Sequence, residues 1–324
     1  MLSIEQAQKI ILRELKSLPI PLEPRKLYEP VKYILNNGGK RLRPALVLLA
    51  CDLFGTDYHK ALNPALGIEV FHNFTLLHDD LMDNSPVRRN KPTVHIKWDP
   101  NTAILSGDVM SILANNLICM VDPNVVIPVS RLFNKTAREV CEGQMLDMNY
   151  SRNENVTISE YINMICLKTS VLIASSLSIG AIVAGASEKD SDILYNFGLN
   201  LGLAFQVQDD LLDSFGDQDV FGKKIGNDIL TNKRTYLVIK AFEKAQGKDL
   251  VELKKYFSGD DFNPREKIKK VKNIFNKLDI RKEAIDRINE FYNNAQMHLN
   301  VLEVSNQRKK VLIEFLEGLM KREK

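Results

Sequence analysis

Apolar side chains recur at helical spacing along most of the chain. The first such stripe consists of Ile4, Ala7, Ile11 and Leu15. A stripe with this period predicts an amphipathic α-helix, and Ser3 with Gln6 is typical of a capping box at its start. No segment of any length shows the apolar–polar alternation of a half-buried strand. The pattern therefore predicts an all-α protein.

Caps and chain breakers divide the rest of the chain into further helices. Thr157 with Glu160 and Ser187 with Asp190 are two more capping-box signatures, and each precedes a long apolar segment. Helices are expected at about 44–54, 63–83, 101–121, 125–150, 158–185 and 188–214, and again after 232. Because neither a linker nor a repeat interrupts this pattern, residues 1–324 are predicted to form one domain.

Two acidic motifs of the same spacing end two of the apolar helices. They are Asp79-Asp80-Leu81-Met82-Asp83 and Asp209-Asp210-Leu211-Leu212-Asp213. Carboxylates four residues apart on a helix share one face and repel each other. A divalent cation with oxygen ligands relieves this repulsion, and Mg²⁺ commonly takes one or two carboxylates plus substrate phosphates. One motif alone is equally an acidic helix cap or a solvated face, but two copies favour two facing metal-binding walls that clamp a diphosphate.

Two basic elements accompany the first acidic motif. Gly38-Gly39-Lys40-Arg41-Leu42-Arg43-Pro44 places three cations before a buried helix, and such a loop is either an anion site or a solvated basic turn. Arg88 and Arg89 follow the first aspartates, where their forks suit phosphate oxygens or form plain salt bridges. His72 lies seven residues before Asp79 and shares its helix face, so it is expected to point into the same site.

Two further polar elements lie in the second half of the chain. Lys168-Thr169 interrupts an otherwise apolar helix. The polar loop 217–233 holds Lys223 between Gly222 and Gly226 and ends at Lys233. This loop is interpreted as a lid that closes on phosphates or as a disordered connector.

Composition indicates no function, but it argues against several classes of protein. The net charge of +3 is small and spread along the chain, which gives no reason to expect a nucleic-acid partner. No apolar run reaches the ~18 residues of a membrane span, so no integral membrane segment is expected. The four cysteines stand singly without metal-ligand spacing, which is typical of reduced thiols in a cytoplasmic protein.

Together the motifs resemble those of the trans-isoprenyl diphosphate synthases, the polyprenyl synthetases. The likeness extends to about residue 240 and lies in residues 38–44, 79–83 with 88–89, 168–169, 205–213 and 222–233. The first motif has two residues between its aspartates, unlike the four of many bacterial farnesyl and geranylgeranyl enzymes. The basic C-terminal tail of eukaryotic farnesyl synthases has no counterpart here.

The resemblance implies a bundle of about ten helices round a central cavity, usually in a homodimer. It implies head-to-tail condensation of isopentenyl diphosphate onto an allylic diphosphate with three Mg²⁺ per site. Asp79, Asp83 and Asp209 are then the expected metal ligands, with Asp213 less direct and with Asp80 and Asp210 supporting them. Neutralisation of the diphosphate would ionise the allylic carbon–oxygen bond.

The resemblance also implies substrate roles. The residues expected to hold the allylic diphosphate are Arg88, Lys168, Lys223 and Lys233. Thr169 and Gln206 would face its reacting end, where neutral oxygens stabilise a cation without trapping it. The residues expected to hold isopentenyl diphosphate are Lys40, Arg43, His72 and Arg89. No general base is evident, so the departing diphosphate is expected to accept the proton.

Product length is expected to be set on the helix before Asp79. Thr75 and Phe71 lie four and eight residues before Asp79 on a similar face, and Phe74 lies five before it. A ring ~7.5 Å up the helix should stop elongation after a few isoprene units. By family resemblance, Phe74-Thr75 favours a geranylgeranyl (C20) product, with farnesyl (C15) next. The alternative is that Phe74 is only a core residue.

Other functions stay open at this stage. A longer-chain polyprenyl diphosphate synthase would share every motif. A terpene cyclase shares the first aspartate motif but does not need the basic elements at 40–43 and 88–89. A non-catalytic subunit of a prenyl synthase should have lost aspartates or lysines, and this chain retains them.

Overall fold

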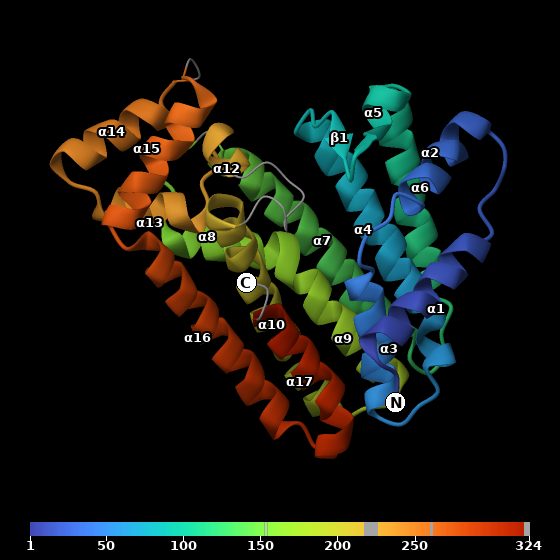
Figure 1. Cartoon of the computed structure of the whole chain (residues 1–324). Coiled ribbons are helices and arrows are strands. Elements are labelled where there is room, and N and C mark those ends of the chain that lie inside the picture. Colours follow the sequence, from blue (N-terminus) through green and yellow to red (C-terminus); the bar gives the residue numbers. More distant parts are fainter. Residues whose placement is uncertain (152, 154, 217–225, 260–261, 321–324) are drawn as a thin grey trace. The chain divides into compact units, whose positions relative to one another are not determined.

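The computed structural model in Figure 1 describes residues 1–151, 153, 155–216, 226–259 and 262–320. The chain is almost entirely helical, which confirms the all-α prediction. Within these ranges the helical segments outnumber the ten expected, because the C-terminal third is divided into several helices. The chain divides into two compact units, each built from separate stretches of sequence. The prediction of a single domain stays a prediction.

The first unit comprises Met1–Ala137, Leu172–Tyr195 and Val301–Phe315. Its elements include α1 (Ile4–Ser17), α2 (Arg25–Leu35), α3 (Leu42–Leu53), the 3₁₀ turn η1 (Tyr58–Ala61), α4 (Leu62–Met82), α5 (Val94–Lys97), α6 (Pro100–Ile118) and α9 (Val171–Val183). The Ser3 capping box forms as predicted. Figure 1 shows α4 and α6 side by side. They approach closely at Gly67, where an added Cβ would lie 2.9 Å from the Ala114 carbonyl oxygen.

The second unit comprises Arg138–Val171, Asn196–Asn300 and Leu316–Lys324. Its elements include α8 (Ile158–Ile165), the π-helical turn η2 (Cys166–Ser170), α12 (Asn227–Leu230), α13 (Tyr236–Lys244), α14 (Gly247–Phe257), α15 (Pro264–Lys277) and most of α16 (Ile280–Val301). Three helices contribute to both units, namely α7 (Val126–Tyr150), α10 (Glu188–Phe215) and α17 (Asn306–Met320).

The structure corrects two local predictions. The helix expected at 158–185 is divided by the π-helical turn at Cys166–Ser170, where Lys168 and Thr169 lie. A short antiparallel hairpin, β1 (Val87–Arg88) paired with β2 (Lys91–Pro92), also forms. Periodicity could not reveal it, because two-residue strands are too short to show alternation. Its turn residues Arg89 and Asn90 have φ of 52° and 61°, as a two-residue type I′ turn requires.

One apolar stretch bears on the prediction that no segment spans a membrane. In the part of the chain described, Ile158–Val183 is the one helical stretch long and apolar enough to cross a bilayer. However, 72% of its most apolar 18-residue window is buried inside the protein. A buried core helix has this composition too, so the stretch gives little support for a membrane segment.

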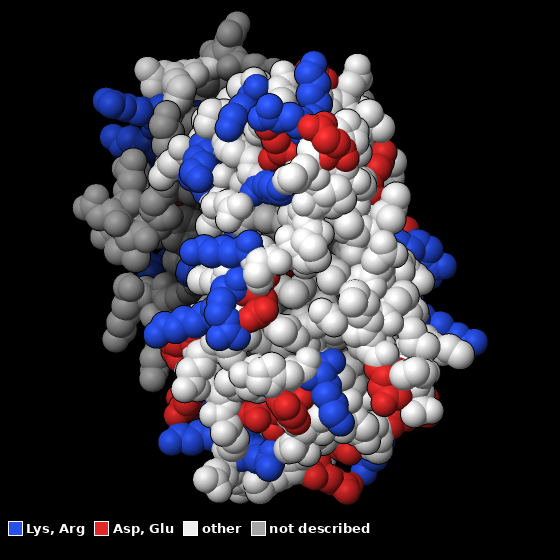
Figure 2. Space-filling view, turned by 90° about the vertical axis from the view of Figure 1, so that its right-hand side faces the viewer, with Lys and Arg blue, Asp and Glu red and all other residues white. Residues whose placement is uncertain are grey.

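The surface of the first unit carries exposed apolar side chains. On α6, Leu105 is 58% and Ile112 is 60% exposed, and their separation of seven residues places them on one helix face. Figure 2 shows a face of the molecule on which charged side chains surround a broad uncharged area.

Candidate active site

The glycine pair before α3 makes room for an arginine. Gly38 and Gly39 have φ of 79° and 117°, a backbone region that favours glycine. A Cβ on Gly39 would lie 2.7 Å from the guanidinium of Arg89, and Arg89 Nη1 donates to the Gly38 carbonyl oxygen. The close approach of Arg89 therefore requires that residue 39 carry no side chain.

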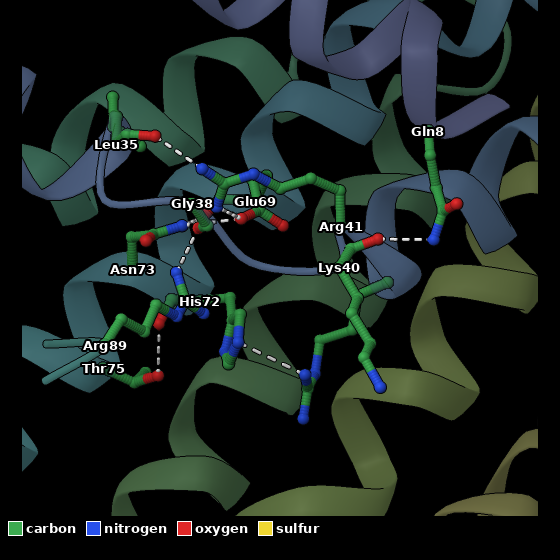
Figure 3. Close-up of polar contacts among 11 residues, drawn as sticks. Gln8, Leu35, Gly38, Lys40, Arg41, Glu69, His72, Asn73, Thr75 and Arg89 are labelled. Atoms are coloured by element: carbon green, nitrogen blue, oxygen red, sulfur yellow. Dashed lines mark hydrogen bonds and ion pairs between the residues drawn. The ribbon is translucent and has the colours of Figure 1, made fainter. Parts of the chain in front are cut away.

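A buried ion pair holds the same loop from the other side. Arg41 is 4% and Glu69 is 2% exposed, and Arg41 Nη1 donates to Glu69 Oε1. Asn73 Nδ2 donates to the same carboxylate at 2.7 Å, and Arg41 Nη2 donates to the Leu35 carbonyl oxygen at 2.5 Å (Figure 3). The sequence analysis gave Arg41 no separate role. The available signal was Glu69, a lone acid within an apolar helix.

Arg43 and His72 are brought together as predicted. Arg43 Nη1 lies 3.2 Å from His72 Nε2. Burial, reinforced by the charges of Arg43 and Arg89, holds the pKa of His72 well below its ordinary value. The neutral ring therefore accepts the Arg43 hydrogen bond. Lys40 is exposed beside this pair, and its carbonyl oxygen accepts from Gln8 Nε2 at 2.5 Å (Figure 3).

The first aspartate motif lies at the end of α4 beside the hairpin. Asp79 is half-buried, Asp80 is buried and Asp83 is exposed. Arg88 Nε donates to Asp80 Oδ1 at 2.7 Å, and its Nη2 lies 3.5 Å from Asp79 Oδ2. Burial raises the pKa of Asp80, although Arg88 opposes this shift. Arg88 thus forms the salt bridges that the sequence left as an alternative to phosphate binding.

The residues expected to set chain length lie one to two turns earlier on α4. Phe74 packs between Phe71 and His78, with ring centroids 5.4 Å and 4.8 Å away. Phe71 is 1% exposed, whereas Phe74 is half-buried. Thr75 donates its hydroxyl hydrogen to the His72 carbonyl oxygen at 2.8 Å. Phe71 is therefore a core residue, and Phe74 presents part of its ring beyond the core.

His78 was not assigned a role from the sequence, but it supports Phe74. Its Nε2 lies 3.1 Å from the Ile104 carbonyl oxygen on α6. This approach depends on Gly107, because a Cβ there would lie 2.1 Å from His78 Nε2.

In the second unit, the π-helical turn presents Lys168 to an acidic partner. Lys168 Nζ forms a 2.6 Å ion pair with Asp147 Oδ2 on α7. Burial alone would raise the pKa of Asp147, but the charges of Lys233 and Lys168 outweigh it and lower the pKa. A Cβ on Gly143 would lie 2.3 Å from the Lys168 backbone nitrogen. Lys168 and Lys233 thus share one carboxylate, which the sequence analysis had left unassigned.

Thr169 and Gln206, which the resemblance assigned to the same end of the allylic substrate, are in contact. Thr169 Oγ1 donates to Gln206 Oε1 at 3.1 Å, and Gln206 Nε2 donates to Asp210 Oδ1 at 3.3 Å. The other oxygen of Asp210 accepts from the Tyr161 hydroxyl and, at 3.2 Å, from the Tyr236 backbone N–H. Burial, together with the charge of Asp228, raises the pKa of Asp210 to about 7. Thr169 lies in the π-helical turn, and π turns inside α-helices are frequent at functional sites.

The remaining predicted residues lie near the end of α10. Asp209 and Asp213 are half-buried. Asp213 Oδ2 accepts the Asp228 backbone N–H at 3.0 Å, which ties the second motif to α12. Lys223 and most of the proposed lid at 217–233 lie outside the described residues.

The donor set fits a hard divalent cation. The candidate ligands Asp79, Asp83, Asp209 and Asp213 offer carboxylate oxygens only, which suit Mg²⁺ with phosphate oxygens completing its coordination. Within the described residues, no three His, Cys, Asp or Glu side chains group closely enough to hold a metal by themselves. The carboxylates of one unit alone would therefore leave ligand positions to substrate and water.

A family model for polyprenyl synthetase matches residues 24–275. The chain belongs to this family. A geranylgeranyl pyrophosphate synthase from Geoglobus acetivorans is 38% identical over 99% of this chain and 98% of its own. A geranylfarnesyl diphosphate synthase from Natronomonas pharaonis is 38% identical over 74% of this chain and 75% of its own. A crystal structure of a geranylgeranyl pyrophosphate synthase matches with a TM-score of 0.95 and 43% identity, covering 100% of both chains.

Family membership decides the class of chemistry. This polyprenyl synthetase is a trans-prenyltransferase of isoprenoid biosynthesis. Its family implies isoprenoid diphosphate substrates and a divalent metal cofactor.

Proposed function

We propose that this protein condenses isopentenyl diphosphate with allylic diphosphates, in a Mg²⁺-dependent reaction, to a short all-trans polyprenyl diphosphate. Geranylgeranyl diphosphate is the favoured product and farnesyl diphosphate the next. The full-length match to a geranylgeranyl pyrophosphate synthase carries this proposal. The retained aspartates and basic residues support it.

The first unit supplies the proposed site for isopentenyl diphosphate. Lys40, Arg43 and Arg89 hold its diphosphate, with the forks of the two arginines matched to phosphate oxygens. His72 stays neutral and orients Arg43 through their 3.2 Å contact. The Arg41–Glu69 pair fixes the loop between them.

The allylic diphosphate takes the other cations. Arg88, Lys168 and Lys233 are proposed to bind it, and Lys223 is proposed to join them. In the structure Arg88 and Lys168 pair with aspartates, so substrate binding exchanges these carboxylates for phosphate oxygens. Three Mg²⁺, held by Asp79, Asp83 and Asp209 with help from Asp213, would neutralise the leaving diphosphate.

The reacting carbon is proposed to lie against neutral oxygens. Thr169 and Gln206 direct their oxygens toward the developing allylic cation, and such dipoles stabilise charge without forming a bond to it. The double bond of isopentenyl diphosphate then attacks that carbon. The proton lost from the adduct passes to the departing diphosphate.

Chain length is proposed to depend on Phe74. Its half-buried ring, held between Phe71 and His78, blocks the path of the growing chain. The small Thr75 leaves room for the C20 product.

A longer product is the second candidate. The geranylfarnesyl synthase of Natronomonas pharaonis matches this chain as well as the Geoglobus enzyme does in identity. Neither a terpene cyclase nor a non-catalytic subunit is favoured, because the isopentenyl site and both aspartate motifs are retained.

Three broader properties complete the proposal. The exposed apolar face of α6 with Leu105 and Ile112 supports a homodimer, since association would remove this surface from water. We further propose a cytoplasmic protein in which residues 1–324 act as one catalytic domain.

The test uses purified protein with Mg²⁺, labelled isopentenyl diphosphate and three allylic primers of different length. We expect mainly C20 product, and no product after EDTA treatment. A dominant C25 product would establish the second candidate. Product formed without added isopentenyl diphosphate would indicate a cyclase, and no product from any primer would contradict the proposal.

A further inference from the structure

Tyr161 has no role in the proposed chemistry, yet it is a buried hydrogen-bond donor beside it. The side chain lies on α8 and is 2% exposed. Its hydroxyl donates to Asp210 Oδ2, across 49 residues of sequence. Burial and the neighbouring carboxylate raise the pKa of Tyr161 well above its ordinary value, so the phenol keeps its proton.

The hydrogen bonds to Asp210 divide between its two oxygens. Oδ2 accepts from the Tyr161 hydroxyl and the Tyr236 backbone N–H. Oδ1 is left to face Gln206, whose Nε2 lies 3.3 Å away. Two donors on one oxygen, from different helices, therefore set the rotation of the whole carboxyl group.

That rotation decides which end of the Gln206 amide faces Thr169. Oδ1 accepts from Gln206 Nε2, and an acceptor oxygen takes the NH₂ end of an amide. The carbonyl oxygen then points the other way and accepts from Thr169 Oγ1 at 3.1 Å. A reversed amide would place its positive NH₂ end toward Thr169 instead.

We propose that Tyr161 is a positioning residue for prenyl transfer, which acts through Asp210 to turn the amide oxygen of Gln206 toward Thr169 and the allylic carbon. This inference rests on the proposed function, which places Thr169 and Gln206 at the reacting end of the allylic substrate. Tyr161 touches neither substrate nor metal in this scheme. Its effect is on the barrier of the chemical step, because an oriented dipole matters most where charge develops.

The test compares Tyr161→Phe with Tyr256→Phe. Tyr256 is a matched control, because it is also buried, lies in the same unit and donates its hydroxyl to a carboxylate, Glu266 Oε1, at 3.3 Å. We expect Tyr161→Phe to lower kcat about 10- to 100-fold, as loss of a supporting hydrogen bond does around metal and active sites. The KM for isopentenyl diphosphate should stay within about twofold, and Tyr256→Phe should keep kcat within about twofold.

A double-mutant cycle separates positioning from general damage. In a Gln206→Leu background there is no amide to orient, so Tyr161→Phe should lower kcat by less than about threefold further. The proposal would be overturned if the losses in kcat from Tyr161→Phe and Gln206→Leu multiplied in the double variant. Equal kcat values for Tyr161→Phe and Tyr256→Phe would also overturn it.

A measurement without turnover keeps the proposal testable if Tyr161→Phe folds poorly. Protein labelled with ¹⁵N in glutamine side chains should show a Gln206 NH₂ signal, identified by its loss in Gln206→Leu, that exchanges slowly with solvent. The signal should shift in Tyr161→Phe but not in Tyr256→Phe. A wild-type Gln206 signal that exchanges as fast as those of exposed glutamines would contradict the inference, whereas wild-type protein that makes no prenyl product would contradict the proposed function alone.

Discussion

Asp80 and Asp210 are the second of the three aspartates in their motifs, and each is 3% exposed. In the first unit Asp80 is held by a cation, Arg88, at 2.7 Å. In the second unit Asp210 is held by three uncharged donors, which are the Tyr161 hydroxyl, the Tyr236 backbone N–H and the Gln206 amide. Burial raises the pKa of both carboxyls, and a cation opposes the shift in each case: Arg88 in contact with Asp80, and the charge of Lys233 at Asp210.

The difference shows that the same aspartate motif can be held by two kinds of hydrogen-bond partner. Arg88 is 29% exposed, so substrate phosphates and salt can reach and compete for it. Of the partners of Asp210, Tyr161 and Tyr236 are buried and Gln206 is half-buried, so packing sets most of their geometry. Arg88 can therefore exchange Asp80 for another partner, whereas the donors around Asp210 hold that carboxyl in a fixed orientation.

Glycine-to-alanine substitutions should show the largest difference in stability loss between the two units. In the second unit a Cβ on Gly143 would meet the Lys168 backbone at 2.3 Å, which cannot yield without moving the π turn. We expect Gly143→Ala to lower the free energy of unfolding by about 3 kcal/mol and to reduce activity through Lys168. In the first unit the atoms nearest to a Cβ on Gly107 belong to the His78 side chain, which can turn away, so a loss of about 1 kcal/mol is expected for Gly107→Ala. Urea unfolding measures both, and equal losses would contradict this comparison.

Weakening one contact of each aspartate should test the same comparison. Tyr161→Phe leaves buried Asp210 with one donor fewer and should lower the unfolding free energy by about 2 kcal/mol at any salt concentration. Asp80→Asn weakens a half-exposed ion pair, so about 1 kcal/mol is expected at low salt and less in 1 M KCl. Urea unfolding at two KCl concentrations tests this, and the same salt response in both variants would refute the distinction.

Phe74→Ala should act on the product more than on the fold. The half-buried ring packs on Phe71 and His78, and its removal opens a path along α4. We expect products at least one isoprene unit longer, with a kcat within about threefold of the wild-type value. Chromatography of the dephosphorylated products gives the result, and Phe71→Leu in the core behind it serves as the control. Unchanged chain length would mean that Phe74 is only a core residue.

The effect that is smallest at neutral pH, and that grows only in acid, should be on the stability of the first unit. Burial among arginines lowers the pKa of His72, so the folded protein leaves the ring neutral where the unfolded chain, with a pKa of about 6.5, binds a proton. Stability is therefore lost as the pH falls below about 6.5, by up to ~1.4 kcal/mol per unit for this one group. His72→Gln should flatten that part of the profile of unfolding free energy against pH. Parallel profiles for the two proteins between pH 7 and 5 would contradict it.

Sequence alone predicted most of the helices and their caps, and it supplied a list of candidate residues whose roles stay predictions. The Ser3 and Thr157 capping boxes formed where they were expected, because a cap depends on residues within one helical turn. The resemblance placed Arg43 with His72, and Thr169 with Gln206, in shared substrate sites, and the members of each pair are in contact. The proposed metal roles of Asp79, Asp83, Asp209 and Asp213 stay predictions.

Only the tertiary structure decided what supports these residues. Arg41 pairs with Glu69 across 28 residues, and Tyr161 with Asp210 across 49. The close approaches at Gly39, Gly107 and Gly143 likewise join separate segments. Periodicity and capping report each helix and its neighbouring turns, whereas the partner of a buried polar group is chosen by how distant helices pack. A buried donor must find an acceptor wherever the fold brings one, and that choice is not written in local sequence.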